Sequence, residues 1–153
     1  NCIKIMKIMK KIMALIGLVV LSLSCDLKEP CIEISVGPPY FTVEILDKTS
    51  NENVFTNGTY KQNQLEVNTQ NSTSGSYKFI SENNRNVIGI TPSLQEGTFT
   101  TTIILNNQIT IPIKTIIVER YSSCHANTFI ESVIVNGYSF TYDESTGIYK
   151  IKI

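Results

Sequence analysis

Residues 98–118 read TFTTTIILNNQITIPIKTIIV, and this stretch decides the fold class. Threonine and isoleucine dominate it, and β-branched side chains favour strands over helices. Asn106-Asn107 interrupts the run with two residues of a type common in turns. The stretch therefore predicts a hairpin, with one strand over residues 98–105 and the other over residues 108–118.

The second strand of this hairpin contains a change of phase. Its apolar residues fall into two sets of opposite parity, Ile109, Ile111 and Ile113 in the first and Ile116 and Val118 in the second. A β-bulge near Lys114-Thr115, or a strand that crosses between sheets, would explain this change. Pro112 has no N–H to donate to a neighbouring strand, so we predict an edge position for it.

Working outward, the remaining chain shows the same two-residue period. Apolar or aromatic runs separated by polar turns occur at residues 41–45, 65–67, 77–79, 87–90, 130–135, 138–142 and 149–153. Asn136-Gly137 separates two of these runs. Asparagine and glycine both accept positive φ, so this pair predicts a tight hairpin.

The strand count and the composition together predict an all-β domain. Some nine or ten short strands are expected, and Ala126 is the only alanine after residue 24, which disfavours long helices. We predict an antiparallel, immunoglobulin-like Greek-key β-sandwich over residues 31–153, with a small β-barrel as the second possibility. Tryptophan is absent, so the sequence implies the architecture of antibody domains but no kinship with them.

The first 24 residues predict a signal peptide. Four lysines precede an apolar run over residues 12–24, and no acidic residue comes before Asp26. The run is shorter than the roughly 20 residues that a membrane-spanning helix needs. A basic segment, a short apolar segment and small residues before a cleavage site are typical of secretory signals. Met6 or Met9 is the expected natural start.

Cys25 ends this run and resembles the cysteine of bacterial lipoprotein signals, where cleavage precedes the cysteine and its sulfur receives a diacylglycerol. The sequence departs from that pattern at Ser22, where leucine is usual. Ser22 and Ser24 would also suit an ordinary signal peptidase. Both interpretations give a mature chain that starts at Cys25, and they differ in whether it carries lipid.

The number of cysteines favours lipidation. Cys2 lies in or before the signal, so lipidation of Cys25 leaves Cys31 and Cys124, which can pair. Their disulfide would close a long loop and stabilise the domain by about 4 kcal/mol. The alternative is two separate buried thiols.

The charge of the mature chain excludes one class of partner. Beyond residue 24 the chain has nine lysines and arginines against 13 acidic residues, a net charge of −4. Nucleic acid binding needs a surplus of basic residues, so we predict no nucleic acid partner.

Residues 25–30 form a polar tether. Its residues 26–29 are similar to export signals of Bacteroidota surface lipoproteins and suit a solvated linker equally well.

No set of residues predicts catalysis, a metal or a cofactor. His125 is the only histidine, whereas a metal site needs three or four ligands, and a disulfide at Cys124 would consume the neighbouring thiol. Four alternate residues have side chains that can bind calcium but lack the central glycine and terminal glutamate of a calcium loop, namely Asp47, Thr49, Asn51 and Asn53. A turn explains them better.

Two further patterns have candidate binding roles. Residues 57–59 and 71–73 match the N-glycosylation triplet, and both fall in expected turns. A sugar-stacking platform could be built from five tyrosines, Tyr40, Tyr60, Tyr121, Tyr138 and Tyr142. Aromatic residues at a two-residue period are more often core or cross-strand pairs, so we expect most of them to be structural.

The chain resembles small uncharacterised lipoproteins of the Bacteroidota, of the flavobacterial type. The resemblance rests on the signal, the tether and the segments 43–49, 53–55, 136–138 and 146–149. It implies an exported protein, anchored to the outer membrane through Cys25 and facing the periplasm or the cell surface. We expect a non-enzymatic domain that binds an envelope protein or has a structural role. The alternatives are a glycan-binding accessory of a surface uptake system and, least favoured, an enzyme.

Overall fold

The computed structural model describes residues 37–82, 85–121 and 126–153. These residues form nine strands and one short 3-10 turn, η1 (Gln62–Gln64), and include no α-helix. The strands are β1 (Phe41–Leu46), β2 (Leu65–Gln70), β3 (Ser76–Glu82), β4 (Arg85–Thr91), β5 (Gly97–Leu105), β6 (Ile109–Tyr121), β7 (Ala126–Val135), β8 (Ser139–Asp143) and β9 (Ile148–Lys152). The predicted all-β class is confirmed for this part of the chain.

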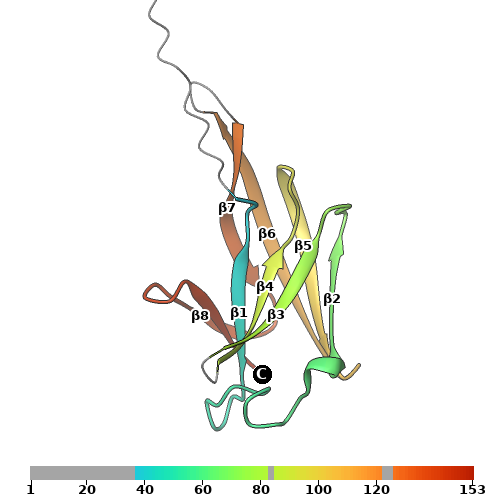
Figure 1. Cartoon of the computed structure of the whole chain (residues 1–153), viewed down its shortest axis with the longest axis vertical. Helices are drawn as coiled ribbons and strands as arrows, with labels where there is room; N and C mark the ends of the chain where they lie inside the picture. The colour runs from blue at the N-terminus through green and yellow to red at the C-terminus, as the bar shows by residue number, and fades with distance from the viewer. Residues whose placement is uncertain (1–36, 83–84, 122–125) are drawn as a thin grey trace, which may run out of the picture. The chain divides into compact units, whose positions relative to one another are not determined.

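Five strands form the first sheet, sheet A, in the order β3-β4-β1-β9-β8 (Figure 1). Four of its strands are joined as the hairpins β3–β4 and β8–β9. Strand β1 lies between these hairpins and pairs parallel to β9, with Val43 opposite Tyr149. The prediction of a purely antiparallel fold is therefore wrong at this pair. The connection between the two strands spans nearly the whole domain, which no local sequence signal reports.

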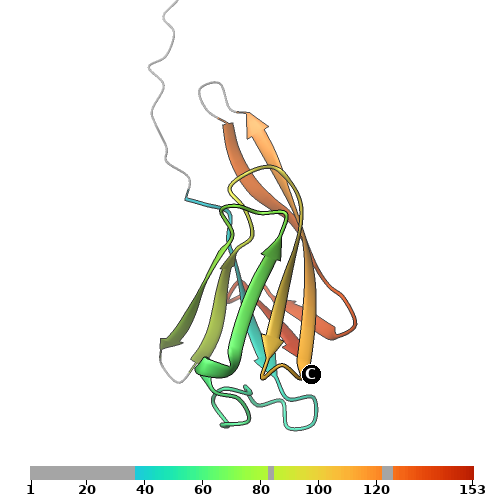
Figure 2. The ribbon, with the colours of Figure 1, turned by 90° about the vertical axis from the view of Figure 1, so that its right-hand side faces the viewer.

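Four strands form the second sheet, sheet B, in the order β2-β5-β6-β7. Figure 2 shows β2 in front, with the hairpin β3–β4 on one side and the hairpin β5–β6 on the other. The predicted β5–β6 hairpin is confirmed, with Leu105 opposite Ile109. Asn106 and Asn107 both have positive φ, 51° and 55°, so the turn takes the geometry that asparagine tolerates.

One hydrophobic cluster includes buried residues of both sheets. Sheet A contributes Phe41, Val43, Ile45, Ile88, Ile90 and Ile151, and sheet B contributes Leu65, Ile103, Leu105, Ile111, Ile113, Val133 and Val135. Residues of one parity in each strand therefore face a common core, as the two-residue period predicts. The arrangement is sandwich-like, with two separate sheets among the described strands rather than the barrel that was the second possibility.

Strand β6 does not change phase and stays in sheet B, so the predicted change of phase and the alternative of a crossing between sheets are wrong, although a register irregularity does lie close to Lys114-Thr115. The buried residues of β6 keep one parity throughout because Thr115 occupies a core position, while Ile116 lies on the outer face. Because Thr115 is polar but buried and Ile116 is apolar but on the outer face, the pattern of apolar residues in the sequence shifts by one position while the strand itself does not. The register does shift in the β6–β7 pair between Ile116 and Ile117, where Glu131 of β7 is the unpaired residue.

The predicted edge position of Pro112 is also wrong, because β6 lies between β5 and β7. The Pro112 carbonyl accepts a hydrogen bond from the Asn136 N–H at 2.9 Å, just beyond the end of β7. The proline nitrogen points to the same side as its carbonyl. The missing N–H therefore falls where the β7 ladder has ended and costs no strand pairing.

The predicted hairpin at Asn136-Gly137 does not form. Strand β7 pairs with β6 in sheet B, whereas β8 pairs with β9 in sheet A. Gly137 has a φ of 81°, but Asn136 is not in the positive-φ region that a type I′ turn requires of both residues. The connection instead carries the chain from one sheet to the other.

Candidate functional site

The structure separates the five tyrosines that were candidates for a stacking platform. Two of them, Tyr60 and Tyr138, are partly buried and pack against the hydrophobic cluster. Tyr121 lies 79% exposed at the end of β6, where its hydroxyl donates to Glu119 at 2.7 Å. Tyr40 and Tyr142 are also exposed. They belong to two different surfaces of sheet A.

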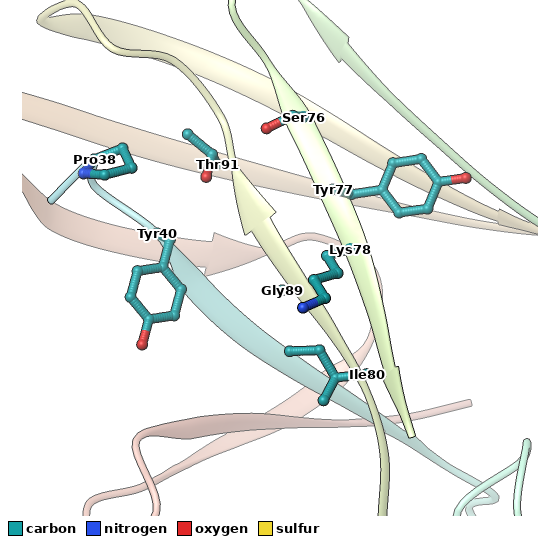
Figure 3. Close-up of a pocket in the computed structure, with 8 residues that line it drawn as sticks. All are labelled: Pro38, Tyr40, Ser76, Tyr77, Lys78, Ile80, Gly89 and Thr91. Atoms are coloured by element: carbon teal, nitrogen blue, oxygen red, sulfur yellow. The ribbon is translucent and has the colours of Figure 1, made fainter. Parts of the chain in front are cut away.

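The first surface is a hollow on the outer face of sheet A, which we call the Gly89 hollow (Figure 3). Its volume is about 260 Å³, and its lining consists of Pro38, Tyr40, Ser76, Tyr77, Lys78, Ile80, Gly89 and Thr91. Figure 3 shows Lys78 and Ile80 directed toward Gly89, while the Tyr77 ring points away. The volume lies just below the ~300–1,000 Å³ of drug-sized ligand sites. The hollow therefore suits a small ligand or one unit of a polymer.

The hollow exists because a glycine lies within β4, an interior strand of sheet A. Gly89 pairs with Lys78 of β3 on one side and with Thr42 of β1 on the other, without a bulge. A side chain at Gly89 would point to the outer face and fill the space between these neighbours. Its absence leaves the depression that the Ile80 side chain only partly covers.

Nothing in the backbone requires glycine at this position. The φ of Gly89 is outside the positive region. A Cβ atom built there would meet the Ile80 Cδ1 at 3.5 Å and the Lys78 carbonyl oxygen at 3.8 Å, which are ordinary contacts. Glycine inside a strand is unfavourable by roughly 0.5–1 kcal/mol relative to alanine, and often marks a place where a ligand approaches the backbone.

The groups around Gly89 offer three kinds of contact. The Tyr40 ring is 67% exposed and can stack on an apolar face of a ligand. Lys78 has no salt bridge within the described residues, so its ammonium group is available to an anion. The hydroxyl groups of Ser76 and Thr91 line the same rim. This combination of one aromatic ring, one cation and two hydroxyls suits a polar ring compound with a carboxylate.

The second surface is an aromatic group on β8 and β9, on the face of sheet A that bears the core. Phe140 and Tyr142 are 37% and 51% exposed. The Tyr149 ring lies between them and the core, with its centroid 4.7 Å from that of Tyr142 and 6.4 Å from that of Phe140. Burial raises the pKa of Tyr149 above its ordinary value. Of these three residues, only Tyr142 is among the five tyrosines predicted as stacking candidates from the sequence.

The turn between β8 and β9 forms where the sequence predicts it. The Lys150 Nζ lies 2.8 Å from the Asp143 Oδ2, so Lys150 does not simply face solvent as its position in the strand suggests. Hydrogen bonds from Lys150 and from Ser145 hold the pKa of Asp143 well below its ordinary value. This pair joins the end of β8 to β9 across the hairpin.

The remaining candidates among the described residues are turns. The Asp47 Oδ1 accepts the N–H groups of Thr49 and Ser50 at 2.9 and 2.7 Å, so this carboxylate closes a turn. These hydrogen bonds lower the pKa of Asp47. In the triplet 57–59, the Asn57 side chain accepts both the N–H and the hydroxyl of Thr59. The described part of the chain holds no group of three or more potential metal ligands of the His, Cys, Asp or Glu type.

Several predicted residues lie outside the described ranges. They are the signal peptide over residues 1–24, the tether over residues 25–30, Cys25, Cys31, Cys124 and His125. Within the described residues, no helix is long and apolar enough to cross a membrane.

Comparison with known proteins gives no further guidance to the site. The chain matches no family model, no curated protein and no solved structure. Function is therefore inferred from the sequence and the geometry of this chain.

Proposed function

We propose that the chain is a non-enzymatic lipoprotein of the outer membrane, anchored by a diacylglycerol on Cys25, whose domain is a binding module. The signal-like residues 1–24 and the polar tether support the anchor. We also propose that the domain has an immunoglobulin-like Greek-key topology. In support, the connections β1–β2, β2–β3, β4–β5 and β7–β8 each pass from one sheet to the other.

The ligand we propose is a glycan that carries a carboxylate, bound in the Gly89 hollow. The single observation behind this proposal is a glycine within an interior strand of a five-stranded sheet, at a position where the backbone does not need glycine. Tyr40 would stack on a sugar ring seated over Gly89, and the Lys78 ammonium would meet the carboxylate of a uronic acid. A glycan-binding accessory of an uptake system would present such a face to the polymer.

A test of this site compares two substitutions of the same residue. Gly89→Val should abolish binding of a galacturonic acid oligomer by filling the floor of the hollow. Gly89→Ala should weaken it by at least tenfold while raising the free energy of unfolding by about 0.4–1 kcal/mol, because alanine restricts the unfolded chain more than glycine does. Titration calorimetry and urea unfolding give the two quantities.

Controls for this test come from the same chain. Tyr40→Ala should also lose at least tenfold in affinity, whereas Tyr121→Ala, which truncates a still more exposed tyrosine that does not line the hollow, should bind as the natural chain does. A neutral galactose oligomer of the same length should bind more weakly than the acidic one. Equal affinity of Tyr40→Ala and Tyr121→Ala would contradict the proposed site.

The anchor has its own measurement, the intact mass of the protein made from its own signal in a bacterial host. We expect the mass of residues 25–153 plus a diacylglycerol increment, less two hydrogens for a disulfide between Cys31 and Cys124. Cys25→Ser should abolish the lipid increment. The mass of the bare polypeptide in the natural chain would contradict the anchor and indicate a soluble exported protein.

A further inference from the structure

Among the described strands the two sheets have four edge strands, and three of them carry features that discourage pairing with another chain. Edge strands expose unpaired backbone groups, and proteins protect them with charges, prolines or bulges. Lys78 lies in the middle of β3, Glu66 lies in β2, and β7 has the bulge at Glu131. Strand β8 (Ser139–Asp143), at the outer edge of sheet A in Figure 1, has none of these features before its last residue.

The backbone N–H and C=O groups of successive β8 residues point alternately toward β9 and toward the open edge of the sheet. The Asp143 carbonyl accepts the N–H of Gly147 at 2.7 Å inside the hairpin, so Asp143 faces β9. Alternate residues of an antiparallel strand direct their N–H and C=O groups to opposite sides. Thr141 therefore also faces β9, and Phe140 and Tyr142 present their N–H and C=O groups to the open edge.

The sequence of β8 is complementary to itself. A second β8 laid antiparallel and centred on Thr141 places Phe140 opposite Tyr142 of the other copy, and Tyr142 opposite its Phe140. Each of these pairs can exchange both backbone hydrogen bonds, because both residues face the open edge. The aromatic rings would then form cross-strand pairs on one face, and Tyr149 already holds them from behind.

We propose that a second copy of this chain docks on β8 in this register and joins the two copies of sheet A into one continuous sheet. No lysine or arginine lies in β8, and Asp143, its only charged residue, would lie opposite Ser139 of the other copy. The two copies of β8 would therefore place no like charges opposite each other. The pairing of aromatic with aromatic residues and of Asp143 with an uncharged residue in this register favours a second copy over an unrelated extended peptide.

Disulfide trapping in the full chain tests the register. In the proposed dimer Thr141 lies directly opposite Thr141 of the other copy as a non-hydrogen-bonded pair, the closer type in a sheet. Thr141→Cys should therefore give at least tenfold more covalent dimer under mild oxidation than Ser139→Cys, whose cysteine would face Asp143. The unsubstituted chain gives the background from its own cysteines.

A second substitution distinguishes specific pairing from chance collision. Tyr142→Lys, added to Thr141→Cys, places a charge in the edge strand and should reduce the covalent dimer at least tenfold, with the urea midpoint showing that the fold persists. Equal trapping at positions 139 and 141, trapping to a different protein, or no effect of Tyr142→Lys would overturn the proposal. The Gly89 hollow takes no part in this experiment.

Discussion

Replacement of Ile113 with alanine should lower the free energy of unfolding by about 3 kcal/mol, within the ~2–5 kcal/mol typical of such truncations. Ile113 is fully buried in β6, an interior strand of sheet B, and belongs to the cluster that both sheets share. Its removal creates a cavity that rigid strands on either side cannot close. Urea unfolding of the natural and substituted chains measures the loss.

Two companion variants make this result specific. Ile113→Val removes one methyl group and should cost only about 1 kcal/mol. Ile134→Ala truncates an isoleucine that is 42% exposed on β7. It should lower the free energy of unfolding by no more than half as much as Ile113→Ala does. If Ile113→Ala cost no more than Ile134→Ala, Ile113 would not lie in a shared core, contrary to the packing of the two sheets.

The sequence predicts most strands because one face of each strand is buried. In β1 the alternation of Phe41, Val43 and Ile45 with polar residues corresponds to the core face. The rule fails at Thr115, which is fully buried with a hydroxyl that has no hydrogen-bond partner among the described residues. Packing decides such a position, and a period calculated from polarity cannot detect it.

Long-range pairing limits what the sequence reveals about the sites. The Gly89 hollow combines Tyr40, Lys78 and Gly89, which lie just before β1 and in β3 and β4 and meet only through the register of the sheet. The one local sequence feature that points to the hollow is a glycine within the otherwise apolar run over residues 87–90. The parallel pairing of β1 with β9 likewise has no signature in either segment, because neither strand is next to the other in sequence.

Replacement of Asn53 with alanine should also destabilise the domain, by about 2–4 kcal/mol, although Asn53 lies in a loop. Its side-chain amide donates to the Asn86 carbonyl at 2.6 Å and to the Glu44 carboxylate at 3.2 Å. Its side-chain oxygen accepts the N–H groups of Phe55 and Thr56 at 3.0 and 3.2 Å. Asn53 is only 9% exposed, so its loss leaves these partners with little access to water.

The variant Asn53→Asp separates the donor bonds from the acceptor bonds. Aspartate keeps the oxygen that accepts from Phe55 and Thr56, but its charged form cannot donate, and it lies beside Glu44. The two N–H bonds favour the charged carboxyl, but we expect burial, this like charge and the facing Asn86 carbonyl to outweigh them and to raise the folded-state pKa of the new carboxyl above its unfolded value. Its penalty is therefore largest at neutral pH and shrinks as the pH falls through that raised pKa.

Urea unfolding at pH 7 and pH 4 should show this recovery for Asn53→Asp relative to the natural chain and little pH dependence of the loss for Asn53→Ala. Asn57→Ala is the matched control, because Asn57 also closes a turn with its side chain but is exposed. It should cost less than about 1 kcal/mol. Equal losses at positions 53 and 57 would show that Asn53 only closes a turn. A larger loss at position 53 would mean that this loop residue ties β1 to β4 through Glu44 and Asn86 and so helps to set the sheet that carries the Gly89 hollow.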